Sequence, residues 1–282
     1  MGTPAPAATV LSALVGDGHE VAVVVTRADA RRSRRGAPSP SPVKTAAVAM
    51  GLVVSHDIGD VISVGADLGV VVAYGRIIRP PVLGSLPLVN VHFSLLPRWR
   101  GAAPVERAIL AGDPVTGVCL MEVEAGLDTG PVYARAETGV DADETAEALT
   151  ARLADLGAAL LTDGLAAGLG EPRPQTGDAT YAAKLESGDL ALGWERPAVE
   201  LARVVRVGRA WTTWRGQRLL VWEARLSDVA DGGEPGTLKG TTVAAGAGSL
   251  RLVRVQPEGR AALDAQDWVR GARPAPGERL GP

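Results

Sequence analysis

Cysteines and long apolar runs are scarce in this chain of 282 residues. The single cysteine, Cys119, excludes the disulfide framework of a small extracellular domain. It lies in the apolar run TGVCLMEV, so we expect a buried structural thiol rather than a nucleophile. The sequence shows no signal-peptide pattern and no apolar run long enough to cross a bilayer, so we expect neither a leader nor a membrane span. These absences predict a cytoplasmic protein with no membrane partner.

A strong excess of charge of either sign is also lacking, because the formal net charge is −3. This balance predicts no general attraction of the whole molecule to nucleic acid, so any such binding must use a local basic patch. Asparagine and phenylalanine each occur once, as Asn90 and Phe93, and the lysines are Lys44, Lys184 and Lys239. The bias looks like GC-rich coding rather than a physical demand. Rare residue types that persist in such a chain are therefore informative.

Apolar runs of strand length alternate with helical patterns over the first 170 residues. Runs that are apolar on both faces and separated by helices indicate a mainly parallel sheet covered on both sides. The sequence thus predicts an α/β class with a Rossmann-like sheet. We expect strands at 19–26, 68–75, 88–93, about 115–123 and about 131–138, and helices at 6–17, 43–51, about 104–111 and 144–169.

Gly, Pro and polar residues are concentrated in 171–189, which we interpret as a linker between a catalytic domain at 1–170 and a second domain at 190–282. Beyond it, the β-rich runs 217–226, 241–246 and 248–257 are separated by Gly-rich turns. This pattern is typical of a small β-barrel or sandwich, and we expect an OB-like β-barrel. The sequence shows no internal repeat, no Walker-type phosphate loop and no pattern that predicts a metal site.

The stretch VNVHFSLLPRWRGAAP, residues 89–104, holds the single asparagine next to a histidine. Side chains alternate along a strand, so Asn90 and His92 share one face while Val89 and Val91 share the other. They lie at the carboxyl end of a predicted parallel strand, where α/β sheets bind ligands. A lone buried histidine is usually a core residue, but its pairing with the single asparagine favours a functional site. An amide donor beside an imidazole suits stabilisation of a developing oxyanion.

An imidazole that takes part in catalysis needs an orienting or proton-accepting partner. Asp128, in the Gly-flanked loop AGLDTGPV between two predicted strands, is the candidate. The alternative is that Asp128 only caps its own turn. Local sequence alone leaves both interpretations open.

The motif N-V-H-x-S-L-L-P-R-W-R-G-A-A-P followed by G-L-D-T-G resembles the 10-formyltetrahydrofolate-dependent formyltransferase family. Within that family, R-W-R-G-A-A-P and the β-rich C-terminal part resemble the branch that acts on methionyl-tRNA. The similarity covers nearly the whole chain. Further matching segments are G-T-P at 2–4, S-P-V-K at 41–44, V-V-A-Y-G at 71–75, Y-A-A-K-L at 181–185, W-T-T-W-R-G at 211–216, V-Q-P-E-G-R at 255–260 and W-V-R-G-A-R at 268–273.

The resemblance implies that Asn90 and His92 polarise the formyl carbonyl of 10-formyltetrahydrofolate. It also implies that Asp128 sets the state of His92 and helps to remove the proton of the attacking amine. That amine would be the α-amino group of methionyl-initiator tRNA, formylated for translation initiation by an enzyme that we expect to be monomeric. The residues implied to line the folate site are Val72, Ala73, Tyr74, Ser94, Leu95, Leu96 and Pro97.

Two basic sets are candidates for contact with tRNA. The family inserts a loop corresponding to 27–44 into the acceptor arm, although such a run is otherwise most often solvated surface. The candidates in this first set are Arg31, Arg32, Arg34, Arg35 and Lys44. The second set comprises Arg203, Arg206, Arg209, Arg215 and Arg218, interleaved with Trp211 and Trp214. Core packing of these tryptophans is an equally good account.

The sequence departs from the family at its start, where Met1 directly precedes the G-T-P segment and a first strand is missing. That strand would be central in the sheet, so its absence exposes neighbouring edges unless another segment fills the gap. Competing interpretations are a formyltransferase acting on an amino sugar nucleotide, a formyltetrahydrofolate hydrolase, and a catalytically inert tRNA-binding paralogue.

Overall fold

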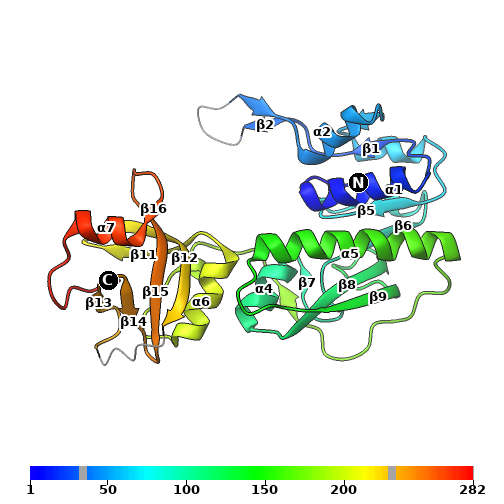
Figure 1. The fold of residues 1–282 in the computed structure, drawn as a ribbon. Helices are drawn as coiled ribbons and strands as arrows, with labels where there is room; N and C mark the ends of the chain where they lie inside the picture. Colours follow the sequence, from blue (N-terminus) through cyan, green and yellow to red (C-terminus); the bar gives the residue numbers. More distant parts are fainter. Residues whose placement is uncertain (32–36, 228–232, 282) are drawn as a thin grey trace. The chain divides into compact units, whose positions relative to one another are not determined.

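The chain divides into two units in the computed structural model, which describes residues 1–31, 37–227 and 233–281 (Figure 1). The first unit comprises Met1–Val105, Val115–Val140 and Ala148–Lys184. The second comprises Glu106–Pro114, Asp141–Glu147 and the described part of Leu185–Pro282. The predicted domain boundaries stay predictions, because this division assigns short internal segments to the second unit.

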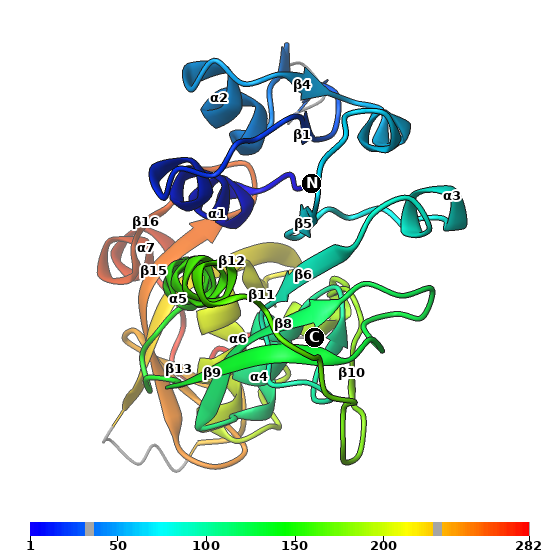
Figure 2. The same ribbon diagram turned by 90° about the vertical axis from the view of Figure 1, so that its right-hand side faces the viewer.

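Parallel strands with intervening helices form the start of the first unit, as the α/β prediction requires. Strands β1 and β4 pair in parallel, as do β5 and β6, and then β8 and β9 continue antiparallel from β6 (Figure 2). The strands are β1 (Val24–Val25), β4 (Val54–Ser55), β5 (Gly69–Val71), β6 (Leu88–His92), β8 (Val115–Glu122) and β9 (Val132–Gly139). The helices are α1 (Ala5–Gly16), α2 (Pro42–Ala49), η1 (Ile58–Ile62), α3 (Pro80–Leu83) and α5 (Ala146–Ala167), whereas most of α4 (Pro104–Ala111) belongs to the second unit.

Strand β1 is much shorter than the predicted 19–26, because it has few neighbours to pair with. A strand persists only where its N–H and C=O groups find partners, and β4 supplies partners only near Val24 and Val25. The residues just before β1 line a cavity of about 480 Å³ that also borders residues 64–70. The apolar run was therefore identified correctly as buried at its end, but its extent as a strand was wrong.

Met1 and Gly2 occupy part of the gap that the sequence predicts ahead of α1. The Gly2 N–H donates to the Val25 carbonyl at 3.1 Å, and the Val72 N–H donates to the Met1 carbonyl at 2.9 Å. Gly2 also forms a parallel bridge with Val72. Two residues of extended chain thus connect β1 to β5 and anchor α1 at the carboxyl ends of these strands.

Helix α5 packs on β6 and β8 through a glycine. A Cβ atom at Gly157 would lie 2.7 Å from Val91 Cγ1 and 3.2 Å from Val118 Cγ1, both closer than ordinary van der Waals contact. The helix also buries Leu149, Leu153 and Leu161 completely. The helix thus packs against the face of β6 opposite Asn90 and His92, and it holds this strand in place.

Gly157→Ala is expected to destabilise the chain by about 1–3 kcal/mol, the usual cost of overpacking a core. Alanine ordinarily stabilises a helix relative to glycine by about 1 kcal/mol. A decrease in the free energy of unfolding would therefore show that close packing at this position outweighs the helix preference. Gly164→Ala is the matched control in α5, because its Cβ would meet the ends of two flexible side chains, Leu169 Cδ2 at 3.1 Å and Leu120 Cδ1 at 3.6 Å. Urea unfolding of both variants checks the prediction, and equal stability of the two would contradict it.

The second unit is built on an antiparallel sheet, as the β-rich pattern predicts. Its strands run in the order β11-β12-β15-β14-β13, with β16 paired to β15. Closure of this sheet into a barrel stays a prediction. The strands are β11 (Ala210–Trp214), β12 (Gln217–Ser227), β13 (Leu238–Lys239), β14 (Thr242–Ala244), β15 (Ser249–Pro257) and β16 (Leu263–Asp264).

The interpretation of this region as purely β-rich missed two helices, α6 (Ala198–Val207) and α7 (Ala265–Ala272). Helix α6 buries Ala198, Leu201, Val204 and Val205, a helical spacing that its valines disguise because β-branched residues are typical of strands. Both helices contribute to the core of the second unit, which also includes Trp194, Val221 and Leu250.

Candidate active site

Strand β6 presents the predicted pair at the carboxyl end of the first unit's sheet. His92 is buried and Asn90 is half-buried, while Val89 and Val91, which alternate with them, are 0% and 2% exposed. Opposite them in the ladder, Asn90 pairs with Val71 of the parallel neighbour β5 and His92 with Cys119 of β8. The alternation places the amide and the imidazole on the same face of the strand, as predicted.

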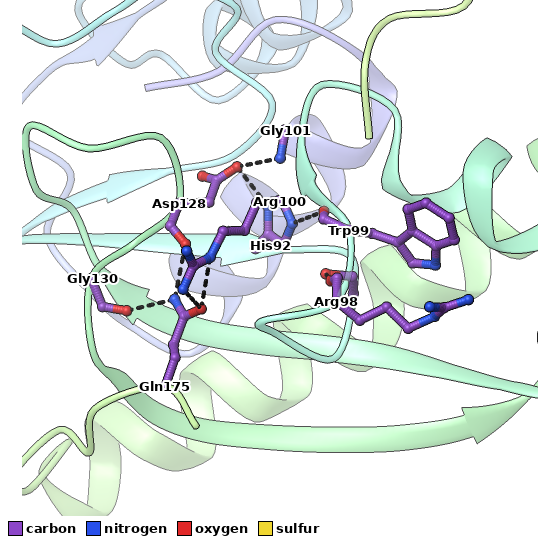
Figure 3. A network of polar contacts seen from close by, with 9 residues as sticks. His92, Arg98, Trp99, Arg100, Gly101, Asp128, Gly130 and Gln175 are labelled. Atoms are coloured by element: carbon purple, nitrogen blue, oxygen red, sulfur yellow. Dashed lines mark hydrogen bonds and ion pairs between the residues drawn. The ribbon is translucent and has the colours of Figure 1, made fainter. Parts of the chain in front are cut away.

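The imidazole of His92 lies between a backbone carbonyl and a carboxylate (Figure 3). Its Nε2 is 3.0 Å from the Trp99 carbonyl oxygen. A carbonyl oxygen only accepts, so Nε2 carries the proton and donates it in this bond. Nδ1 faces the carboxylate oxygen Oδ2 of Asp128 at 3.7 Å. The structure therefore brings His92 and Asp128 together, which local sequence left open.

The carboxylate of Asp128 is held by the chain that follows β6. The Gly101 N–H donates to Asp128 Oδ2 at 2.7 Å. Gly101 belongs to β7 (Arg100–Gly101), which pairs in parallel with β10 (Tyr181–Ala182). A Cβ at Gly101 would lie 2.8 Å from the Ala182 carbonyl oxygen, and its φ is +124°, so glycine is required at this contact. Asp128 accepts a bond from the active-site loop instead of capping its own turn.

Several residues beside this pair were not predicted as site residues. Trp99 supplies the carbonyl that orients His92, and the Trp99 N–H donates to Thr180 Oγ1 at 2.9 Å. Gln175 contacts both Arg100 and the Asp128 loop. Gln175 and Thr180 come from the segment interpreted as a linker, where the Pro- and Gly-rich composition carries no signal for a site residue. The motif R-W-R-G was recognised, but the contacts of its backbone have no local signature.

The predicted folate-lining residues split into two groups in the structure. Ala73 is exposed and has a φ of +44°, whereas Val72 and Tyr74 on either side of it are buried. The hydroxyl of Tyr74 is buried and has no hydrogen-bond partner within the described chain. This segment follows β5 directly, so its backbone lies at the same edge of the sheet as Asn90.

The second group follows β6 and supports the loop from within. Ser94 is fully buried, and its hydroxyl donates to the Arg98 carbonyl at 2.6 Å. Leu96 packs with Cys119 and Met121. Leu95 and Pro97 are only half-buried. Contact of these residues with folate stays a prediction, although the side chains of Ser94 and Leu96 already have partners in the protein.

Arg31 and Lys44 are the members of the first basic set that lie within the described residues. Strand β2 (Ala30–Arg31) pairs antiparallel with β3 (Pro38–Ser39), and Arg31 is exposed. The ammonium group of Lys44 donates to Asp29 Oδ1 at 2.7 Å, so its charge is partly balanced. Arg32, Arg34 and Arg35 lie outside the described residues.

The second basic set is largely occupied by contacts within its own unit. The Arg215 guanidinium forms a two-bond pair with Glu278 at 2.6 and 2.8 Å, which lowers the pKa of that carboxyl to about 2. Arg215 also lies over the Trp214 ring at 4.0 Å, and Trp214 meets Trp268 edge to face at 5.4 Å. Core packing, the alternative account of this tryptophan, is what the structure shows for Trp214.

The other arginines of the second set differ in exposure. Arg206 donates to the carbonyls of Asp141 and Ala142, and burial lowers its pKa. Half-buried Arg203 donates to a backbone carbonyl at 3.5 Å. Arg209 and Arg218 are exposed, and Arg218 lies over the Trp211 ring at 4.3 Å. Contact with tRNA through this set stays a prediction.

Cys119 is fully buried, as predicted, and burial raises the pKa of its thiol. This environment disfavours the thiolate and hence nucleophilic chemistry. In residues 1–31, 37–227 and 233–281, no group of three His, Cys, Asp or Glu side chains could hold a metal ion. No helix in the same ranges is long and apolar enough to cross a membrane.

Comparison with known proteins matches both units to domains of the same protein family. A family described as formyl transferase matches residues 1–165, and the formyl transferase C-terminal domain matches residues 184–273. A methionyl-tRNA formyltransferase from Dinoroseobacter shibae is 44% identical over 288 residues, which cover 96% of each chain. A methionyl-tRNA formyltransferase from Symbiobacterium thermophilum is 43% identical over 307 residues, covering 100% of this chain and 94% of that protein.

Solved structures share the fold at lower sequence identity. An N-formyltransferase from Helicobacter canadensis, in complex with folinic acid and dTDP-3-aminofucose, superposes with a TM-score of 0.69 at 15% identity, covering 91% of this chain and 97% of that one. A methionyl-tRNA formyltransferase from Clostridium thermocellum gives a TM-score of 0.54 at 19% identity, covering 64% and 85%. These likenesses show the Rossmann-like fold of the first unit and do not distinguish between acceptors.

Proposed function

Because this chain belongs to the formyl transferase family, we propose that it transfers the formyl group of 10-formyltetrahydrofolate to the α-amino group of methionyl-initiator tRNA. Relatives that are 40–44% identical along nearly the whole chain carry the name methionyl-tRNA formyltransferase, which supports this acceptor. The observation that carries the chemistry is His92 on the Asn90 face of β6, with Nδ1 facing Asp128 at 3.7 Å. The product initiates translation, which takes place in the cytoplasm, so we propose a cytoplasmic location for this chain.

Asn90 and His92 stabilise the charge that develops during transfer. As the amine attacks the formyl carbon, the carbonyl oxygen becomes negative, and donors held in place before the reaction lower that barrier most. The Asn90 amide is one such donor. His92 provides a second when Nδ1 is protonated, since Nε2 is already committed to the Trp99 carbonyl. Both donors sit on a paired strand, so little reorganisation is needed.

Asp128 and His92 together manage the proton. The new C–N bond forms while the bond from the formyl carbon to N10 of the folate breaks, so the amine loses one proton and N10 gains one. When Nδ1 of His92 carries a proton, the ring has no free lone pair, so the Asp128 carboxylate beside it is the acceptor for the proton of the amine. The pair is largely dry, with side chains 6% and 15% exposed, and this strengthens its electrostatic interactions.

An acceptor assay tests the proposed function directly. The purified chain is given 10-formyltetrahydrofolate with either methionyl-initiator tRNA or an amino sugar nucleotide, and formylated product is measured. Formylation of the tRNA alone is expected. Product with the sugar alone, or release of formate with neither acceptor, would replace the proposal by a sugar formyltransferase or a hydrolase. Binding of tRNA without turnover would indicate an inert paralogue.

The basic segment 27–44 is proposed to contact tRNA. Changing Arg34 and Arg35 together to Gln is expected to raise KM for tRNA and to flatten its dependence on salt, because each lost phosphate contact reduces counterion release. The slope of log(kcat/KM) against log[salt] measures this, with Arg251→Gln plus Arg254→Gln as a matched change of two exposed charges in the second unit that belong to neither basic set. An unchanged slope for the variant of Arg34 and Arg35 would refute the contact.

A further inference from the structure

The side-chain amide of Gln175 forms hydrogen bonds with Arg100 on one side and with the loop that carries Asp128 on the other (Figure 3). Its Nε2 donates to the carbonyls of Asp128 and Gly130 at 2.9 and 2.8 Å. Its Oε1 accepts from Nε and Nη2 of Arg100 at 3.0 and 2.7 Å. The reversed amide would set NH₂ against a guanidinium and oxygen against two carbonyls. Only the observed orientation satisfies every group.

The loop needs this support, because the backbone of Asp128 is strained. Its φ is +50°, a left-handed conformation that costs a residue other than glycine about 1–2 kcal/mol. Such a conformation persists only where the surroundings impose it. At the end of the loop, Gly130 passes so close to β8 that an added Cβ would meet the Glu122 carbonyl oxygen at 2.0 Å. The loop is thus tightly placed at one end and strained in its middle.

Asp128 is held from two sides by one short strand and one glutamine. Gly101 of β7 bonds the carboxylate, while Gln175 bonds the backbone carbonyl of the same residue. Arg100, the neighbour of Gly101 on β7, holds the other end of Gln175. The contacts therefore close a ring through Asp128, Gly101, Arg100 and Gln175. A shift of Asp128 requires several of these bonds to break together.

We propose that Gln175 is a positioning residue for formyl transfer: it fixes the Asp128 loop so that the carboxylate stays opposite Nδ1 of His92. This rests on the proposed function, in which Asp128 and His92 manage the proton. Gln175 does not itself touch the reacting atoms. Its loss acts on rate because a displacement of about 1 Å in a catalytic group can cost about 10²-fold.

Two variants separate the parts of this contact. Gln175→Met keeps the length of the side chain and removes all four hydrogen bonds, whereas Gln175→Glu keeps the acceptor for Arg100 and removes both donors to the loop. Both are expected to lower kcat by about 10- to 100-fold, with KM for folate and for tRNA within about threefold of the native values. Gln266→Ala is the control, because Gln266 is exposed in the second unit. Native kcat in either Gln175 variant, or a rise in KM alone, would overturn the proposal.

A spectroscopic readout keeps this inference separate from the proposed function. Long-range ¹H–¹⁵N spectra of the ring nitrogens, with His92 assigned from a His92→Gln sample, report how Nδ1 responds to pH. We expect this response to differ from the native one in Gln175→Met and Gln175→Glu, and to match it in Gln266→Ala. If the native chain formylates no acceptor, the proposed function fails. The spectra still test whether Gln175 positions the Asp128 loop opposite His92. Identical Nδ1 titrations in the native and Gln175→Glu chains would overturn the positioning role.

Discussion

Asn90→Ala and His92→Ala are each expected to lower kcat for formylation of methionyl-tRNA by about 10²–10³-fold, the usual cost of removing one preorganised oxyanion donor. The effect falls on kcat because the negative charge on the formyl oxygen develops only in the transition state. KM for folate and tRNA should change little. Single-turnover formylation at saturating substrates measures the chemical step without interference from product release.

His19→Ala is the matched control for His92→Ala. His19 also has a carboxylate nearby, with Nε2 3.4 Å from Asp17 Oδ2, but it lies outside the site and is partly exposed. It should retain native turnover. The double variant Asn90→Ala with His92→Ala should lose less than the product of the two single effects, because the two donors serve the same oxygen. Turnover within a few-fold of native in either single variant would refute the assignment of these donors.

Asp128→Asn is expected to lower kcat by about 10²–10⁴-fold, the range for loss of a positioned acid–base group. Asparagine tolerates the left-handed backbone at this position, and its carbonyl oxygen can still accept from the Gly101 N–H. The substitution therefore removes the negative charge with little change of geometry. An amide facing Nδ1 cannot take up the proton that the amine must release.

Asp128→Ala provides the comparison that separates charge from structure. It loses the bond to Gly101 and places alanine in a strained conformation, so it should lower the unfolding midpoint as well as kcat. Asp128→Asn should unfold near the native midpoint while remaining nearly inactive. If Asp128→Asn turned over at the native rate, the carboxylate would have no part in proton removal and Asp128 would serve only to order the loop.

The folate-lining prediction shows that recognising a motif does not reveal the role of each residue in it. The stretch S-L-L-P is predicted to contact folate, and this stays a prediction; the structure adds that Ser94 is fully buried and donates to the Arg98 carbonyl, and that Leu96 packs on Cys119. A conspicuous motif can mark residues that shape a loop as readily as residues that touch a ligand. Sequence does not separate the two roles, because both require the same side chain at the same position.

Secondary structure in the second unit shows a similar limit. The strands at 217–227 and 249–257 follow from their apolar alternation, but α6 was missed although its buried residues have helical spacing. Valine-rich segments of about ten residues fit both periods when taken alone. The core around Trp194 and Val221, onto which one face of α6 packs, selects the helix.

The sequence by itself determined that Asn90 and His92 share one face, since alternation along a strand is a property of the local backbone. It also determined the α/β class, because buried parallel strands need long apolar runs and intervening helices. Only the tertiary structure decided that Asp128 faces His92, that the Trp99 carbonyl selects the protonated nitrogen, and that Gln175 braces the loop. The contacts of Asp128 with His92 and Gln175 join segments far apart in the chain, and the contact with Trp99 depends on how the loop after β6 folds back. Their distances depend on the β8–β9 connection and on the pairing of β7 with β10, which no local pattern encodes.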